Sequence, residues 1–145
     1  MIVLFNPDVR FAVGEPPDTS NIAERSAILH SDGRLYLERF HVSEALRLHR
    51  WWGSDDQRAM HDHPWDNQTL VLTGRLLEVT LAGSRLLEPG AVVDRLASEP
   101  HRIELVDDEP VWTVFTVGPV RRRWGFHTSR GWVYWKRWPY AGRVA

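Results

Sequence analysis

The sequence predicts an all-β fold, and three observations lead to that prediction. Short runs with a period of two recur about every ten residues, separated by Gly, Pro, Asp or Ser. No stretch of about 11 residues or more holds a 3.6-residue apolar repeat, so long amphipathic helices are not expected. Parallel βαβ units need crossover helices, for which the sequence offers no candidates. A β-sandwich or a β-barrel of short strands is therefore expected.

The expected strands follow the chain from residue 34 onward. In residues 34–40, Leu35, Leu37 and Arg39 alternate with Tyr36, Glu38 and Phe40; in residues 45–51, Leu46, Leu48 and Arg50 alternate with Arg47, His49 and Trp51. Residues 68–81 are expected to form two strands that bend at Thr73-Gly74. The remaining strands are expected at residues 91–96, 102–105, 111–117 and 131–137.

The chain is expected to form one domain over residues 1–145, partly irregular in residues 1–33, because it contains no repeat or linker. The absence of cysteine excludes disulfides and thiolate metal sites. A formal net charge of −1 gives no field that favours nucleic acid. No apolar run approaches the roughly 20 residues that span a bilayer, and the N-terminal segment lacks a basic leader. A cytoplasmic protein without a membrane partner is expected.

The stretch HDHPWDN (61–67) is the strongest indication of a functional site. If residues 60–63 are extended, His61 and His63 point to one side and Asp62 to the other. Two imidazoles on one face can bind the same ion, but a transition-metal site usually has three or four protein ligands. The pair is therefore interpreted as part of a metal site.

His101 is the best third ligand, because it opens an expected strand that can return beside the histidine pair. The intervening residues 64–100 include two hairpin-like strands and a Pro-Gly turn, which is enough chain for that return. For a fourth ligand, several oxygen and nitrogen donors remain open: Asp66, Asn67, Glu104, His49 and His127.

Aromatic and basic residues supply the candidates for substrate binding. Eight tryptophans are present, and Trp65 and Trp124 are expected to line a pocket beside the histidines. Alternation splits Arg121, Arg122 and Arg123 across two faces, so Arg121 or Arg123 is expected to point inward and bind a substrate carboxylate. The near-neutral chain argues against nucleic acid as the partner of this basic run.

The motif residues resemble those of the cupins. The HxH pair, the turn glycine Gly74, the Pro-Gly turn at 89–90 and the later His101 fit the two cupin motifs. More narrowly, RAMHDHPWDN, PHRIEL and WGFHTSRGWVYW are similar to small bacterial and phage cupins, and the likeness covers residues 45–137. The acid position of the first motif is held by Asn67, with Asp66 one residue early.

This resemblance implies a double-stranded β-helix, a small jelly-roll-like barrel that holds a metal at one end and is often a homodimer. His61, His63 and His101, with Asp66 as an uncertain fourth, are the expected ligands. Fe(II) is the expected metal, with Zn, Mn or Ni as alternatives, and the expected activity is a dioxygenase reaction on a small polar molecule. A Zn- or Mn-dependent isomerase or lyase that acts on a carbohydrate or keto acid is an alternative, as is a non-catalytic ligand-binding protein. His49 and His127 are candidates for the acid or base.

Overall fold

The structure consists almost entirely of strands. A computed structural model describes residues 11–30, 32–55, 59–138 and 143–144, and in this part of the chain the only helix is the short 3₁₀ helix η1 (Trp135–Arg137). The strands are β1 (Arg25–Leu29), β2 (Leu35–His41), β3 (Leu46–Trp51), β4 (Met60–His61), β5 (Asn67–Thr73), β6 (Leu76–Thr80), β7 (Gly83–Leu87), β8 (Val92–Arg95), β9 (His101–Leu105), β10 (Val111–Val117), β11 (Gly125–Thr128), β12 (Gly131–Tyr134) and β13 (Arg143–Val144).

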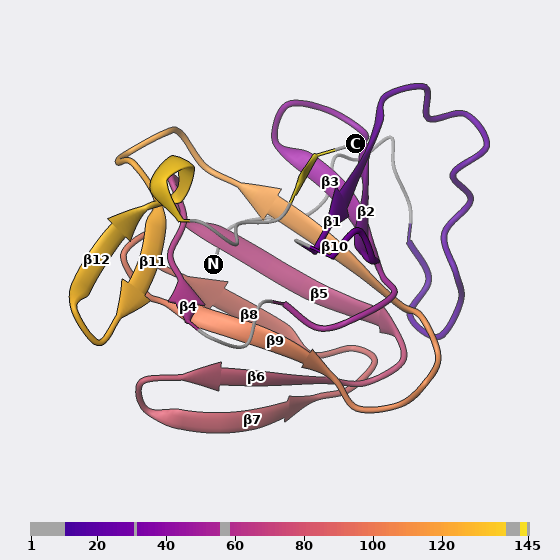
Figure 1. Ribbon diagram of the computed structural model, residues 1–145. Coiled ribbons are helices and arrows are strands. Elements are labelled where there is room, and N and C mark those ends of the chain that lie inside the picture. The colour runs from indigo at the N-terminus through magenta and orange to yellow at the C-terminus, as the bar shows by residue number, and fades with distance from the viewer. Residues whose placement is uncertain (1–10, 31, 56–58, 139–142, 145) are drawn as a thin grey trace.

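The strands form two sheets that pack against each other (Figure 1). The larger sheet has the order β13-β1-β2-β3-β10-β5-β8, and the smaller has the order β12-β11-β4-β9-β6-β7. The pairings are antiparallel, and several join strands far apart in sequence, such as β3 with β10 and β4 with β9. The predicted all-β class is confirmed.

An apolar cluster fills the space between the sheets at one end. Leu37, Trp51 and Val71 from the larger sheet meet Leu76 and Ile103 from the smaller sheet, and all are less than a tenth exposed. Burial of such side chains contributes about 1.5–3 kcal/mol each. Four of these side chains also line the interior cavity, so the cluster forms part of the cavity wall; they are Leu37, Trp51, Leu76 and Ile103.

A second apolar cluster lies on the opposite face of the larger sheet. Its members alternate with the cavity-facing residues of the same strands, and Phe11, Ile22 and Val42 pack against it. The larger sheet therefore buries both of its faces. The buried members of this outer cluster are Phe40, Leu46, Leu48, Leu70, Leu72, Trp112 and Val114.

The predicted bend at Gly74 is confirmed between β5 and β6. Gly74 has φ +77°, and a Cβ atom there would lie 2.6 Å from Cγ2 of Val111. Both the backbone conformation and the close approach of Val111 require glycine.

Apart from the two-residue strands β4 and β13, three strands were not predicted, and one predicted strand is shorter. β1 lies in the segment expected to be partly irregular, and it is held by its pairing with β2. β7 has mostly exposed side chains and follows the tight turn at Gly83, and β11 pairs with both β4 and β12. The predicted strand at 131–137 ends at Tyr134 and continues as η1. β1 and β7 pair with the strand next to them along the chain, and β11 also pairs with the distant β4, so backbone pairing rather than apolar alternation defines these strands.

Candidate metal site

The three predicted histidines come together at one place in the interior. His61 pairs directly with His101 across β4 and β9, and His63 follows two residues after His61 on the same side. The ring centroids of His61 and His101 are 4.9 Å apart, as are those of His63 and His101, and those of His61 and His63 are 5.1 Å apart. One ligand atom from each ring lies within 4.8 Å of the others, so the group could hold a metal ion.

The surroundings keep these imidazoles neutral, which is the form that binds a metal. His63 and His101 are 8% and 5% exposed. Burial lowers the pKa of both rings well below the usual value, and it lowers the pKa of His61 to a smaller extent. Nδ1 of His63 is buried and has no hydrogen-bond partner. Three neutral nitrogen donors with an unsatisfied ring nitrogen fit a divalent transition metal.

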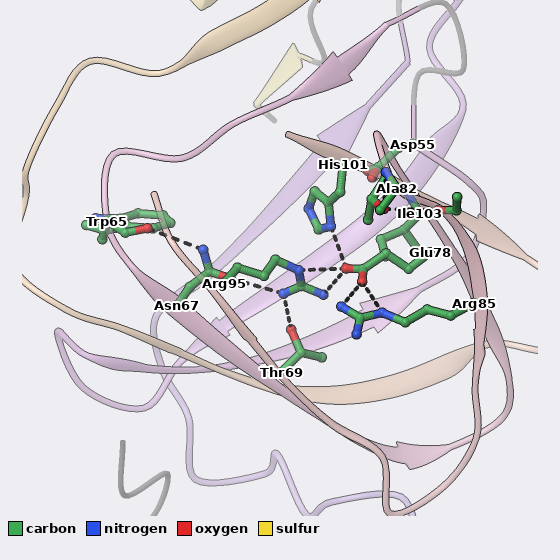
Figure 2. A network of polar contacts seen from close by, with 12 residues as sticks. Asp55, Trp65, Asn67, Thr69, Glu78, Ala82, Arg85, Arg95, His101 and Ile103 are labelled. Atoms are coloured by element: carbon green, nitrogen blue, oxygen red, sulfur yellow. Dashed lines mark hydrogen bonds and ion pairs between the residues drawn. The ribbon is translucent and has the colours of Figure 1, made fainter. Parts of the chain in front are cut away.

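Glu78 holds His101 in position from behind (Figure 2). Its Oε2 atom lies 2.8 Å from Nδ1 of His101, so the ring donates from Nδ1 and leaves the Nε2 lone pair free. Arg95 Nε donates to the same oxygen at 2.6 Å, and Arg85 Nε donates to Oε1 at 2.7 Å. Glu78 is fully buried, and two guanidinium groups compensate its charge.

Glu78 was not among the site residues predicted from the sequence. In β6, Glu78 lies on the same face as the buried Leu76, so a charged residue occupies an inward position of an otherwise predictable strand. A charged residue at an inward-facing position of the strand was the feature of the sequence that could have identified Glu78.

Asp62 holds the histidine pair from the other side. It points away from His61 and His63, as predicted, and its carboxylate accepts hydrogen bonds from Gly125 N at 2.8 Å and Trp132 Nε1 at 2.9 Å. The backbone is also fixed on both edges: Asp62 N donates to Gly125 O, and His63 N donates to Ala97 O. The HxH segment is therefore held rigidly in an extended conformation.

The structure places His127 against Asp62, with Nε2 2.8 Å from Oδ2 of Asp62, and it is not among the described residues that line the cavity. Its role as an acid or base stays a prediction, with Asp62 rather than the cavity beside its Nε2 atom.

A cavity of about 380 Å³ opens beside the three histidines. Trp65 and Trp124, the two tryptophans expected near the site, both line it. The remaining aromatic lining residues are Tyr36, Trp51, Phe115, Phe126 and Trp135.

His49, a candidate acid or base, also lines the cavity. It stacks on Phe115 with 4.9 Å between ring centroids, and Nε2 accepts a hydrogen bond from Arg39 Nε at 3.2 Å. Burial, followed by the positive charge of Arg39, lowers the pKa of His49 well below its usual value. His49 is therefore a neutral imidazole that faces the cavity.

Three predicted site residues lie elsewhere. Asp66 accepts a hydrogen bond from Ala97 N at 2.8 Å and pairs with Arg121 at 3.2 Å, so it is outside the metal-ligand group. Arg123 lies over the ring of Tyr134, 3.9 Å from its centroid. Neither Arg121 nor Arg123 is among the described residues that line the cavity. Their exposed segment follows β10 and turns outward, which alternation alone did not reveal.

Asn67, at the acid position of the first cupin motif, is not a ligand either. Its Oδ1 accepts a hydrogen bond from Arg95 Nη1 at 3.0 Å, and its Nδ2 donates to Trp65 O at 3.3 Å. Within the described residues, the group that could bind a metal has three members, all of them histidines.

The chain was compared with known proteins by sequence and by structure. No protein-family model matches it, and no curated protein matches it by sequence. A cupin-superfamily protein from Silicibacter pomeroyi DSS-3, described as a sugar phosphate isomerase, is similar in structure with a TM-score of 0.53 and 18% identity. The match covers 81% of this chain and 89% of that protein.

Two other similar structures have TM-scores of 0.48. One is an uncharacterized conserved protein with a double-stranded β-helix domain from Klebsiella pneumoniae, 20% identical over 63% of this chain and 84% of that one. The other is a DMSP lyase, 24% identical over 58% of this chain and 48% of its own length.

The chain therefore has the double-stranded β-helix fold that its motif residues predicted, and it shares this fold with the Silicibacter protein. It combines this fold with a three-histidine site able to hold a metal ion. In the part of the chain that the structure describes, no helix has the length and apolarity needed to cross a membrane.

Proposed function

We propose that the chain is a metal-dependent enzyme, specifically a non-haem Fe(II) dioxygenase that acts on a small polar molecule. The observation that supports this proposal is the set of three neutral histidines on the wall of an aromatic cavity. His61, His63 and His101 would hold the metal. When bound, Fe(II) supplies the capacity to react with O₂, and a site with three protein ligands leaves positions for other molecules.

The chain's own residues have separate tasks in this proposal. Glu78 fixes the orientation of His101, and Asp62 fixes the segment that carries the other two ligands. The aromatic wall, including Trp65 and Trp124, excludes water and covers the apolar part of the substrate. His49, a neutral imidazole that lines the cavity, is the candidate to exchange a proton with the substrate once Arg39 releases its Nε2 lone pair.

An isomerase or lyase that uses Zn or Mn is the second candidate. His49 supports it, since proton transfer by a buried neutral base is the central step of such reactions. The Silicibacter protein, which has the same fold, is described as a sugar phosphate isomerase, so this fold can carry out a reaction of that class in another protein.

The first experiment is metal analysis of untagged protein and of its His61→Ala and His101→Ala variants. About one equivalent of metal is expected in the parent and a large loss in both variants, with His30→Ala as a control outside the cluster. If the two variants keep the parent's metal content, the site is wrongly assigned.

The second experiment separates the two reactions. Oxygen uptake with Fe(II) is measured across thiols, amino acids and hydroxy acids, and the same reactions are repeated without oxygen. Turnover that requires oxygen supports the dioxygenase, and turnover that survives strict anaerobiosis supports the isomerase or lyase. Tight ligand binding with no turnover in either condition supports a non-catalytic binding protein instead.

A further inference from the structure

Two arginines face the same end of the cavity as His49. Arg39 on β2 pairs directly with His49 on β3, and Arg47 lies two residues from His49 on that strand. Arg39, Arg47 and His49 all line the cavity, so the three side chains share the inward face of the larger sheet. Residues at this spacing are about 6.5 Å apart along a strand. The guanidinium groups therefore reach one region of the cavity.

Neither guanidinium has a carboxylate partner in the described part of the chain. Of the cavity-lining acids, Asp62 is bound by Gly125 N and Trp132, and Asp55 accepts a hydrogen bond from Ile103 N at 2.8 Å. The third lining arginine, Arg95, is neutralised by Glu78. Among the described residues, Arg39 and Arg47 are the two lining arginines without a carboxylate partner.

The two arginines are held for binding by neighbours other than acids. Arg39 Nε donates to His49 Nε2, so its terminal amino groups are left for another acceptor. The guanidinium of Arg47 lies 4.9 Å from the centre of the Trp65 ring, and its Nε is buried without a hydrogen-bond partner. A buried donor without an acceptor is costly, and this cost is removed if a ligand supplies the acceptor.

Keeping two such charges together is unfavourable without an anion. Burial, and after it the positive charge of Arg47, lowers the pKa of Arg39 to about 10. Burial lowers the pKa of Arg47, and the charge of the exposed Glu24 offsets this effect only in part, without an ion pair to Arg47. An oxyanion in the cavity would compensate both charges at once.

We infer that Arg39 and Arg47 form the binding site for an oxyanion of the substrate, a carboxylate or a phosphate, next to the metal site. Phe115 separates the two regions: its ring centroid is 4.9 Å from that of His49 and 6.2 Å from that of His63. The inference rests on the proposed function, because it takes the cavity as the substrate site. It restricts the substrate class to anionic molecules and replaces Arg121 and Arg123 as the predicted anion-binding residues.

The test is titration calorimetry on the full chain with inorganic phosphate and, separately, with malonate. Each titration is run once after chelation of metal and once with metal restored. The difference separates anion binding to the metal from anion binding to the arginines. We expect the chelated parent to bind an oxyanion, and Arg39→Gln and Arg47→Gln each to weaken binding at least tenfold. Two positive charges predict that phosphate binds more tightly, and tighter binding of malonate would identify a dicarboxylate ligand.

Control variants keep the outcome interpretable. Arg75→Gln removes an exposed arginine outside the cavity and should leave binding unchanged. Arg47→Lys keeps the charge without the planar fork and should retain more affinity than Arg47→Gln. The inference is wrong if the chelated parent binds neither anion, or if both glutamine variants bind as the parent does. Because the first outcome is measured on the parent alone, the test works even if one variant fails to fold.

Metal content measured on the same samples separates this inference from the proposed function. Unchanged metal content with unchanged anion binding in the arginine variants overturns only the oxyanion site. Arginine-dependent anion binding in a protein that retains no metal overturns the metalloenzyme and leaves an anion-binding protein.

Discussion

Nδ1 of His101 lies 2.8 Å from Oε2 of Glu78, and the Glu78 side chain is completely buried. The contact links a candidate metal ligand to a carboxylate that also neutralises Arg95. One side chain thus orients a ligand and balances an interior charge, so its replacement should affect metal binding and stability together.

Glu78→Gln should weaken metal binding about 10–100-fold, because the amide no longer orients His101 as an ionised acceptor. It should also lower the free energy of unfolding by about 3–5 kcal/mol, because Arg95 is left as an uncompensated buried charge. Metal competition titration and urea unfolding measure the two effects. The control is Glu104→Gln, which removes the partner of Arg102; the Glu104 side chain is more exposed than that of Glu78. Parent-like metal affinity in Glu78→Gln would contradict the orienting role.

Asp62→Asn should lower the free energy of unfolding by about 3 kcal/mol, since Asp62 accepts hydrogen bonds in the interior and pairs with Arg122. Urea unfolding measures this effect, and the m-value is expected to stay unchanged. The control is Asp32→Asn, which removes the exposed partner of Arg34 and should change stability little. Equal effects of the two substitutions would show that Asp62 is not a structural anchor.

Gly74→Ala should destabilise the protein by about 2 kcal/mol or more, because the new Cβ meets Val111 in addition to the positive φ. Gly33→Ala is the matched control: Gly33 has φ +90° with open space around it, so about 1 kcal/mol of backbone strain is expected alone. Thermal and urea unfolding of both variants give the difference. A Gly74→Ala variant no less stable than Gly33→Ala would mean that Val111 moves aside freely.

The pH dependence of stability should reflect His49. Burial lowers its pKa in the folded state, so the unfolded chain binds a proton more readily. Its contribution to stability is therefore complete above the unfolded pKa of about 6.5 and is lost as the pH falls below that value.

Urea unfolding of chelated protein between pH 8 and pH 5 measures this effect. His49→Gln should have a shallower loss of stability at acid pH, and at pH 8 it should differ from the parent only by a constant amount. An identical acid slope in the two proteins would show that His49 does not drive the effect.

The metal-ligand group could be predicted because two simple rules determine it. Alternation places His61 and His63 on one side, and strand pairing brings His101 opposite His61. The same periodicity predicts the fold class. β1 could not be predicted from periodicity, because its sequence RSAIL does not alternate; it is a strand through its pairing with the neighbouring β2 and the distant β13.

The cationic end of the cavity was harder to predict. Alternation places Arg47 and His49 on one face of β3 and Leu48 on the other, but a leucine face normally marks the interior. Here the larger sheet is buried on both sides, and the leucine face belongs to the outer cluster. Periodicity separates the two faces, and only the packing determines which one meets the substrate space.

The outer cluster also has a consequence for how this scaffold can change. Much of the chain's buried apolar surface lies on the reverse side of the strands that carry Arg39, His49 and Phe115. Substitutions that change the side chains of the cavity need not alter the outer cluster, which contributes to the stability of the fold. Natural selection, or a protein engineer, can therefore try new specificities on one surface while the other keeps each variant folded.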